Sequence, residues 1–398
     1  MSPVSTRFVM LLVLTSVSAC AVTKVQTGGL VAADGRVFFL PPKYAGQEYG
    51  HGVSLVVDPK LTVDVQDGRH KLTIEPFYRL DPVDDQRSHA DLREASYRLS
   101  LRGWKMGIGA GIFSWGVLES YRPTDVLNQT DFVESVDGTQ KLGQPYAEVG
   151  WAGEKVSITA WYLPYFRERT YQGVRGRPRG ATVVDTGSAQ YETELKQWQP
   201  SGAVRVAVHH RGVDLGIGLF TGLSREPRFV LQLSDLRVSA RYELSQRAMA
   251  DFQWSYKGFS LKAEGFFCLY SKELTRFGGG GAGVDYTFSS FYKGADLTLA
   301  AELLFDTRGD DLPITFFRHN AFAGLRLAIN DTGNTEVTLG TVVDIIDGTT
   351  WGRFEAHRRF GEHWQVAATA NLFFGQQGTI PGSFNRDHYA QLRIAYLF

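Results

Sequence analysis

The sequence of 398 residues has few cysteines, few methionines and no excess charge of either sign. It contains two cysteines and four methionines, and its 42 basic residues balance its 42 acidic residues. One of the two cysteines, Cys20, falls in a predicted export signal, so we expect no structural disulfide. The even charge balance gives no indication of a nucleic-acid partner. After the N-terminus, no apolar run reaches the roughly 18 residues that a membrane-spanning helix requires.

Glycine and aromatic residues, by contrast, are abundant. The chain has 43 glycines, 26 phenylalanines, 17 tyrosines and eight tryptophans. This mixture is unusual for a soluble enzyme. It is typical of a membrane β-barrel, which has glycine in its strands and girdles of aromatic side chains at the membrane interfaces.

The first 21 residues have the pattern of an export signal. Arg7 provides a short positive region, residues 8–14 form an apolar core, and small residues follow. Two cleavage sites are consistent with this pattern. Residues 17–20 resemble the lipobox of bacterial lipoproteins, in which Cys20 becomes the lipidated first residue. Residues 19–21 also satisfy the small-x-small rule of the ordinary signal peptidase.

If the lipobox is used, metabolic labelling with a fatty-acid analogue should tag the mature protein at Cys20. The residue that follows, Ala21, is not the Asp that retains lipoproteins in the inner membrane of some bacteria. An N-terminal sequence that begins at Val22 would instead show cleavage by the ordinary signal peptidase and would end the lipoprotein interpretation.

The last ten residues, 389–398, alternate with a two-residue period. Leu392, Ile394, Tyr396 and Phe398 fall on one side of this period. Because successive strand side chains point to opposite faces, the segment predicts a strand with one apolar and one mostly polar face. The ending resembles the closing strand of bacterial outer-membrane β-barrels, which the barrel assembly machinery reads. Tyr396 and Phe398 are therefore the candidate assembly signal.

The same alternation recurs from Lys71 onward, and in each segment the apolar side chains would face lipid while the polar ones face the lumen. Clear examples are residues 71–79, 94–101, 204–209, 260–269 and 364–372.

Short turns alternate with long connections, as expected for a barrel threaded from one side of the membrane. The sequence thus predicts an all-β fold, a transmembrane antiparallel β-barrel of about 16 strands (14–18) over residues 70–398. Residues 22–69 are predicted to be a periplasmic lead-in or tether that could contain the first strands. Two more wall strands result if the segment before Gln66 pairs.

Short motifs resemble a group of porin-like and alginate-export-like outer-membrane barrels. Trp115-Gly116 ends a predicted strand, and the loop that follows carries Pro-x-Asp and Asn-x-x-Asp within residues 122–132. Residues 91–95 and 163–166 fit the same group. The resemblance covers most of the barrel and implies a porin-like exporter or uptake channel in the bacterial outer membrane, without naming the solute.

The long loop over residues 116–143 is the candidate constriction of the pore. It would either fold into the lumen and present carboxylates there, or remain a solvated surface loop held by its own Asp and Asn turns. The candidate constriction residues are Glu119, Arg122, Asp125, Asn128, Asp131, Glu134 and Asp137.

A second loop, residues 167–197, begins with an arginine-rich stretch. Arginine forks match phosphate and carboxylate geometry, so this stretch could funnel anionic solutes or contact the phosphates of lipopolysaccharide. We expect contact with lipopolysaccharide. The arginines are Arg167, Arg169, Arg175, Arg177 and Arg179.

The polar faces of the predicted strands give a mixed set of lumen-lining charges. Neighbouring opposite charges on a barrel wall mostly pair and hold water, whereas opposed basic and acidic ladders would create a transverse field. The candidates are Lys71, Glu75, Arg79, Glu94, Arg98, Lys262, Glu264, Glu302, Arg326, Arg353, Glu355 and Arg393.

No residues give a convincing catalytic, metal or cofactor site. Adjacent His209 and His210 would point to opposite faces of a strand, and residues 278–281 lack the features of a phosphate loop and are interpreted as a flexible loop end. We therefore expect a non-enzymatic channel for small polar solutes or saccharides, in contact with outer-membrane lipid and lipopolysaccharide. The alternative is a barrel plugged by its loops that acts as a surface adhesin or scaffold.

Overall fold

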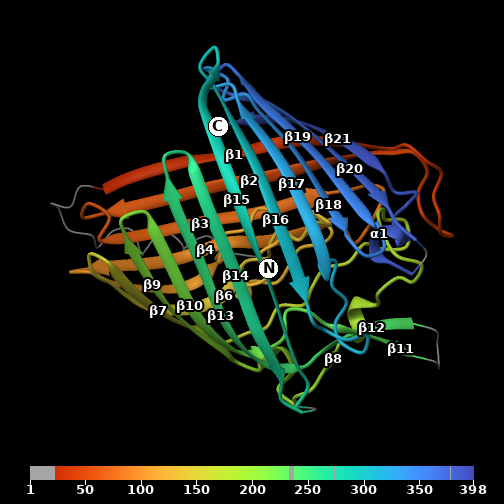
Figure 1. Ribbon diagram of the computed structural model, residues 1–398, viewed down its shortest axis with the longest axis horizontal. Coiled ribbons are helices and arrows are strands. Elements are labelled where there is room, and N and C mark those ends of the chain that lie inside the picture. The colour runs from red at the N-terminus through yellow and green to blue at the C-terminus, as the bar shows by residue number, and fades with distance from the viewer. Residues whose placement is uncertain (1–22, 233–236, 273, 377) are drawn as a thin grey trace, which may run out of the picture.

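The computed structural model describes residues 23–232, 237–272, 274–376 and 378–398, so the predicted export signal and Cys20 lie outside the described residues. The described chain forms a closed β-barrel of 18 strands (Figure 1). The wall strands are β1 (Thr23–Phe38), β2 (His51–Val65), β3 (His70–Leu80), β4 (His89–Leu101), β5 (Trp104–Gly111), β6 (Gln144–Ala152), β7 (Val156–Leu163), β9 (Ser201–His210), β10 (Val213–Leu223), β13 (Leu244–Tyr256), β14 (Phe259–Tyr270), β15 (Arg276–Tyr292), β16 (Ala295–Asp306), β17 (His319–Ala328), β18 (Glu336–Asp344), β19 (Thr350–Phe360), β20 (Trp364–Phe374) and β21 (Tyr389–Leu397).

The other elements belong to the long connections. A small three-stranded sheet consists of β8 (Gln190–Tyr191), β11 (Arg228–Gln232) and β12 (Arg237–Tyr242). The helical elements are η1 (Thr186–Ser188), η2 (Lys196–Trp198) and α1 (Ile380–Ser383). Within the described residues, no helix has the length and apolar character needed to cross a membrane.

The first and last strands close the barrel. β1 pairs with β2 on one side and with β21 on the other, from Leu30 opposite Leu397 to Phe38 opposite Tyr389. Closure matters because an unpaired backbone group in lipid costs several kcal/mol. The predicted closing strand, β21, has the expected faces, since Ile394 is exposed on the outside whereas Arg393 bonds inside the barrel.

Within residues 23–69, β1 and β2 are strands of the wall, so the first strands that the predicted lead-in could contain are present. The prediction allowed two further strands before Gln66, and β1 and β2 are these strands. Added to the predicted number of about 16, they give the 18 strands of the wall. Their strand pattern was obscured by Gly28-Gly29 and by inward charges. Gly29 has φ +139° and lies directly against Pro59 and the Phe398 ring, where a side chain would not fit. Asp34 is buried inside the wall.

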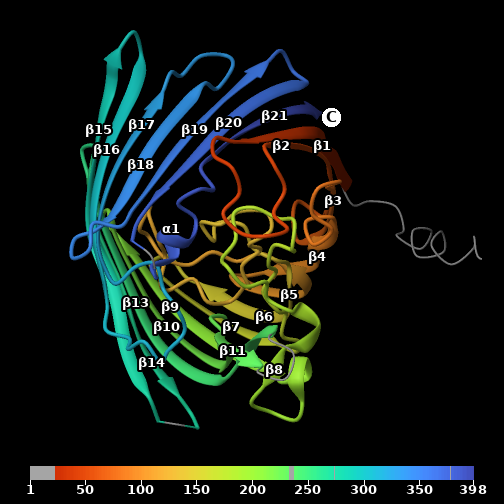
Figure 2. The ribbon, with the colours of Figure 1, turned by 90° about the vertical axis from the view of Figure 1, so that its right-hand side faces the viewer.

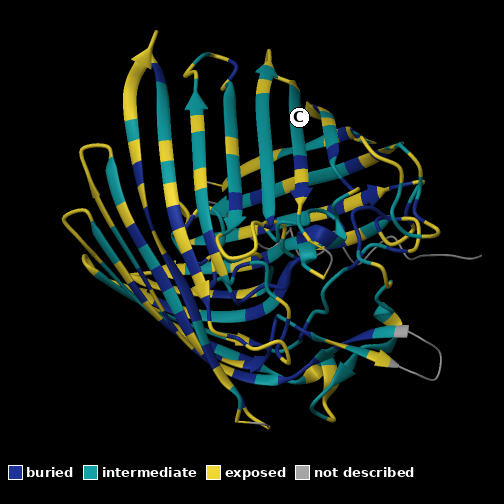
Figure 3. Ribbon diagram, turned by 45° about the vertical axis from the view of Figure 1, so that its right-hand side comes forward, coloured by how far each residue is buried: buried dark blue, intermediate teal, exposed yellow. Residues whose placement is uncertain are grey.

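The two faces of the wall strands differ in exposure, as the alternation in the sequence predicted. Figure 3 shows buried and exposed residues alternating along the wall strands. Tight turns with left-handed backbone, such as Arg102-Gly103 and Lys257-Gly258, connect strands at one rim, which we call the short-turn rim. Aromatic side chains face outward beside these turns, including Trp104 opposite Trp151 and Trp364 opposite Tyr396.

The long connections leave the opposite rim, and several turn into the barrel. Figure 2 shows them between the two sides of the wall. Residues 278–281, interpreted as a loop end, instead lie inside strand β15. The inward-facing member Gly281 leaves room for Leu118 of the β5–β6 loop, because a Cβ at Gly281 would lie 2.8 Å from a Leu118 methyl carbon. Because Gly281 has no side chain, the loop packs directly against the backbone of the wall at this position.

Candidate functional site in the barrel lumen

The loop between β5 and β6, residues 112–143, lies inside the barrel, and Asn128 ties its two ends together. The Asn128 side-chain NH2 donates to the carbonyl oxygens of Gly111 and Leu142, each at 2.8 Å. Its Oδ1 accepts from the Phe113 amide at 2.8 Å. Asn128 is completely buried, so one amide side chain satisfies backbone groups from both loop stems. From this point the loop sends two arms across the lumen.

The first arm, residues 114–127, reaches β14. Glu264, on the inward face of β14, accepts a hydrogen bond from the Val117 amide at 3.3 Å and from Thr124 Oγ1 at 2.7 Å. Glu264 was predicted to line the lumen, and it does so by holding loop backbone. Trp115 at the start of this arm packs above Gly218 of β10, where a Cβ would lie 3.1 Å from the indole.

The same arm also reaches β16. Glu302 accepts from the backbone amides of Glu119 and Ser120 at 2.6 and 3.0 Å. The carboxylate of Glu119 in turn pairs with Lys262 of β14 at 2.7 Å. The predicted lumen residues Glu302 and Lys262 thus hold the arm, and Leu118 between these contacts is fully buried against Leu304.

The second arm, residues 129–139, crosses to the opposite part of the wall. Glu134 forms two hydrogen bonds with Arg79 of β3, at 2.5 and 2.7 Å. Arg79 also pairs with Asp34 of β1 at 2.8 Å, and Asp34 receives two further bonds from Arg393 of β21, at 2.6 and 2.7 Å. This chain of charges joins the loop to the strands that close the barrel.

The tip of the second arm contacts a further strand. Asp137 pairs with Arg353 of β19, and Arg353 also pairs with Glu355 on the same strand. Closer to the loop stem, Asp131 accepts from Thr170 at 2.7 Å and lies 3.3 Å from His89. Together the two arms contact the wall at β3, β14, β16 and β19, so the loop spans the lumen.

The remaining constriction candidates stay within the loop. Arg122 donates to the Leu118 carbonyl at 3.0 Å and to Ser114 at 3.1 Å. Asp125 lies 3.6 Å from Lys141, across the loop. Burial raises the pKa of Asp125 against the opposing charge of Lys141.

Glu134→Gln should loosen the second arm while the wall remains folded. Burial alone would raise the pKa of Glu134, but the hydrogen bonds and charge of Arg79 bring it down to about 2. A hydrogen bond to a charged group is worth about 1.5–3 kcal/mol, so the amide should weaken the anchor by about 2 kcal/mol. Arg79 keeps Asp34 as a partner, which limits the effect on the wall. We expect increased open-channel current noise in a planar bilayer at neutral pH.

The pH dependence of the wild-type protein provides the matched test. Because the pKa of Glu134 in the folded state lies below its ordinary value of 4.5, the anchor is complete above that pH and is lost as the pH falls toward about 2. Wild-type current should therefore become noisier only in acid, where it should approach that of Glu134→Gln. Equal noise in the two proteins at neutral pH would show that this pair does not hold the arm.

Inward charges near the short-turn rim pair along the wall. Glu75 pairs with Lys60 at 2.5 Å, Glu94 pairs with Arg98 at 3.1 Å, and Arg98 lies 3.8 Å from Glu148. Lys60 and Glu148 were not among the predicted lumen residues. Lys71 and Arg326 were predicted to line the lumen, but neither forms an ion pair with any residue that the structure describes.

Four of the five arginines of the second long loop are buried or half-buried, whereas the expected contact with lipopolysaccharide requires exposed side chains. Arg177 is buried and donates to Asp387 at 2.7 Å and to the backbone carbonyls of two other connections. Arg167 bonds to Asp91 and to the Gly143 carbonyl.

Arg179 is also buried and bonds to carbonyls. Arg169 is half-buried and bonds to an amide oxygen and a carbonyl. Arg175 is the exception, with a side chain 54% exposed and paired with Glu48. Guanidinium groups suit this use because their five donors can join several carbonyls, and in this loop they hold the connections to one another.

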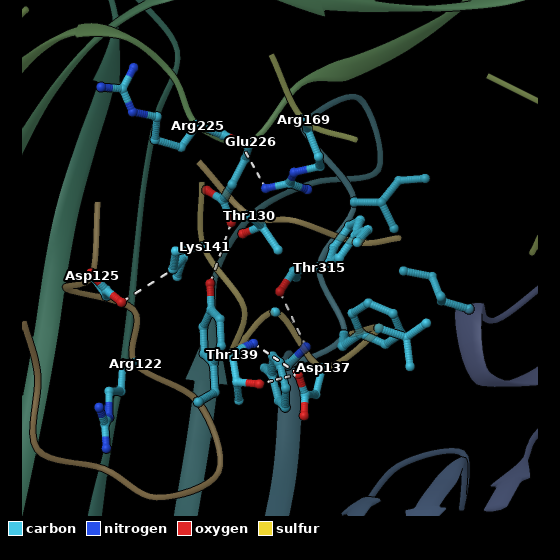
Figure 4. A pocket seen from close by; sticks show the side chains of 18 of the residues that line it. Arg122, Asp125, Thr130, Asp137, Thr139, Lys141, Arg169, Arg225, Glu226 and Thr315 are labelled. Atoms are coloured by element: carbon cyan, nitrogen blue, oxygen red, sulfur yellow. Dashed lines mark hydrogen bonds and ion pairs between the residues drawn. The ribbon is translucent and has the colours of Figure 1, made fainter. Parts of the chain in front are cut away.

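A cavity of about 740 Å³ lies between the β5–β6 loop and the connections above it (Figure 4). Tyr121 from the loop stacks on Phe317 with ring centres 4.2 Å apart. Arg169, Arg225 and Glu226 gather at one end of the cavity, and Arg122 lies at the other. Aromatic side chains that line the cavity include Tyr121, Phe132, Tyr171, Phe316, Phe317 and Trp351.

Glu226 is the centre of a charge cluster that the sequence did not reveal. It pairs with Arg247 of β13 and, at 3.3 Å, with Arg308, which also pairs with Asp306. Burial would favour the neutral acid, but Arg308 and Arg247 hold the pKa of Glu226 well below its usual range. Glu226 follows the end of β10 without any motif, so only the folded chain shows that these residues meet.

Comparisons with known proteins place the fold among outer-membrane barrels. No family model matches the chain, and no curated protein sequence matches it. Solved structures, however, match the fold of this chain. OccAB1 of Acinetobacter baumannii has a TM-score of 0.53 at 8% identity and covers 94% of this chain and 95% of its own. OccD3 of Pseudomonas aeruginosa has a TM-score of 0.52 at 11% identity, with coverage of 93% and 90%.

Wzi of Escherichia coli also has a TM-score of 0.52, at 8% identity, and covers 92% of this chain and 83% of its own. Wzi is described as an outer-membrane protein involved in group 1 capsule assembly and as a carbohydrate-binding β-barrel. At these identities the likeness concerns the fold. Together with the closed 18-stranded wall, it shows that this chain has the fold of these β-barrels of the bacterial outer membrane.

Proposed function

We propose that this outer-membrane β-barrel is a porin-like channel for passive passage of small polar solutes or saccharides, narrowed by the loop of residues 112–143. The observation that carries the proposal is the exposure of charged side chains on the inward wall. Inward side chains such as Lys60, Arg98 and Glu355 remain 37–48% exposed although they lie inside the barrel. Charged groups lose solvation in a dry interior, so this part of the lumen holds water.

The attachment of the loop also supports a constriction. Ion pairs and hydrogen bonds at β3, β14, β16 and β19 hold its two arms, and a cavity of about 740 Å³ remains beside them. A cavity with aromatic faces and polar groups suits sugar rings, which stack on aromatic side chains. The carbohydrate binding stated for Wzi agrees with the inclusion of saccharides.

The second candidate function is a loop-plugged barrel that serves as a surface adhesin or scaffold. The observation that favours it is the network of buried arginines in the second long loop. Arg177 and Arg179 join that loop to the β1–β2 and β20–β21 connections on the far side of the barrel mouth. A rigid cover of this kind would block passage.

Swelling of proteoliposomes distinguishes the two functions. Liposomes that contain the full-length, heat-modifiable barrel are diluted into isotonic arabinose, glucose or sucrose, with protein-free liposomes as the control. A channel gives swelling rates above the control that fall as the sugar becomes larger. Rates equal to those of protein-free liposomes for every sugar would exclude the channel and favour the plugged barrel.

A further inference from the structure

Every carboxylate among the described residues that line the lumen cavity has a cationic partner. Four of these described residues are acidic, and each has one or more basic neighbours within ion-pair distance. Their neutralisation means that the acids contribute little negative potential to the cavity. The pairs are Glu119 with Lys262, Asp125 with Lys141, Asp137 with Arg353, and Glu226 with Arg247 and Arg308.

Several cavity arginines have no such partner. Within the part of the chain that the structure describes, the guanidinium groups of four of them bond only to carbonyl, amide or hydroxyl oxygens, although the backbone amide of Arg179 donates to the Asp387 carboxylate. Arg225, for example, is buried and donates to the carbonyls of Leu127 and Leu223. The four are Arg122, Arg169, Arg179 and Arg225.

Arg225 remains charged at neutral pH although it is buried. Burial, together with the nearby charge of Arg247, lowers the pKa of Arg225 to about 9, which still leaves the guanidinium protonated at neutral pH. Carbonyl, amide and hydroxyl oxygens do not neutralise a cation, although carboxylates beyond ion-pair distance, such as Glu226 near Arg169, offset part of its charge. The cavity therefore has an excess of positive charge.

Arg169 is the arginine best placed to contact a solute. Its Nε donates to Gln129 at 3.2 Å and its Nη2 to the Arg225 carbonyl at 2.8 Å. The guanidinium carbon lies over the Phe132 ring, 4.7 Å from its centre, in a cation–π contact. These contacts involve two of its three nitrogens, and Nη1 has no hydrogen bond to any described residue. Figure 4 shows the Arg169 guanidinium beside the cavity.

We infer that the cavity binds small solutes that carry a carboxylate or phosphate group, with Arg169 contacting the oxyanion and Arg122, Arg179 and Arg225 supplying positive potential. The inference rests on the proposed function, since it names the class of solute for that channel. An oxyanion would accept from the unused face of Arg169 in a charge-assisted hydrogen bond. The aromatic walls around Phe132 and Tyr121 would contact the remainder of the solute.

Isothermal titration of the full-length barrel in detergent tests this assignment with matched ligand pairs. Gluconate differs from sorbitol by one carboxylate, and glucose 6-phosphate differs from glucose by one phosphate. We expect each anion to bind roughly tenfold or more tightly than its neutral partner, as one charge-assisted hydrogen bond predicts. A preference for gluconate alone would assign the site to carboxylates, and a preference for glucose 6-phosphate alone would assign it to phosphates.

Arg169→Gln should abolish most of this preference without changing the affinity for sorbitol or glucose. The matched control is Arg276→Gln, which removes an exposed arginine at the start of β15 and should leave the preference intact. If Arg169→Gln does not give heat-modifiable barrel, Arg122→Gln is the second variant, because its side chain is exposed and should lower the preference without loss of fold.

Two results would overturn the inference. They are equal affinities within both ligand pairs, and an anion preference that survives the substitutions at Arg169 and Arg122. Titration measures binding and does not depend on passage through the barrel. The channel and the anion site can therefore be contradicted independently of each other. Anion preference without liposome swelling would contradict the channel alone, whereas swelling without anion preference would contradict the anion site alone.

Discussion

Deletion of residues 118–138 is expected to raise single-channel conductance severalfold and to shift selectivity further toward anions. The deletion removes both arms of the loop from the lumen, and the wall remains because a closed hydrogen-bond ladder holds its strands. Loop-closure cost changes only slowly with length, so the shortened connection should be tolerated. Asn128 is lost with the arms, and the short loop that remains no longer needs it to join its stems.

The expected selectivity shift follows from the ion pairs of the loop. Glu119, Glu134 and Asp137 pair with wall cations in the intact protein. Their removal leaves Lys262 and Arg79 with wall carboxylates as partners and less total negative charge in the lumen. The permeability ratio from reversal potentials in a salt gradient measures this shift.

A substitution outside the lumen serves as the control for the deletion. Asp310→Asn removes a carboxylate whose side chain is 94% exposed and should change neither conductance nor selectivity. Unchanged conductance in a deletion variant with normal heat modifiability would show that the loop does not limit the pore.

Phe398→Ser is expected to lower the amount of assembled barrel sharply. The side chain of Phe398 is 51% exposed on the outer face, and its backbone amide donates to the Gly29 carbonyl at 3.2 Å. The last strand must pair with both β20 and β1, because unpaired backbone in lipid costs several kcal/mol for each group. A hydroxyl in place of the Phe398 ring should weaken the seating of the strand at the seam, where the ring lies against Gly29. Heat-modifiable barrel in outer-membrane fractions measures the loss.

Phe360→Ser separates a terminal signal from general loss of an aromatic side chain. Phe360 ends β19 near the same rim and is 52% exposed, so the chemical change and the exposure match. We expect near-normal barrel levels for this variant. Equal levels for Phe360→Ser and Phe398→Ser, whether both normal or both low, would contradict a special role of the C-terminal residue.

The barrel was predictable because the wall obeys a local rule. Alternation around Leu261 or Leu392 requires only the neighbouring residues, since lipid and lumen lie on opposite faces of each strand. The rule failed in β1, where buried Asp34 and the Gly28-Gly29 pair interrupt the apolar set. Those residues serve contacts with β21 and β3, which lie far away in sequence and carry no local signal.

Some of the charged residues that line the lumen were predictable, but others, such as Lys60 and Glu148, and the contacts of all of them were not. Glu264, Glu302 and Arg79 were expected to face inward, and they do. Their partners could not be inferred, because Glu264 meets Val117 across 147 residues of sequence. The arginines of residues 167–179 show the same limit. Their composition suggested a binding surface, yet Arg177 is buried in contacts between loops. The sequence also gave no indication that Arg225 and Glu226 meet the β5–β6 loop.

Single-channel recording of the wild-type barrel in a planar lipid bilayer tests the central claim most directly. The purified full-length protein is added to one side of the membrane in concentrated potassium chloride, and current is followed at fixed voltage. The account predicts discrete, stable current steps of uniform size, with a reversal potential in a salt gradient that shows preference for the anion. Incorporation of heat-modifiable protein with no current steps at any voltage would contradict the channel and leave a barrel closed by its own loops.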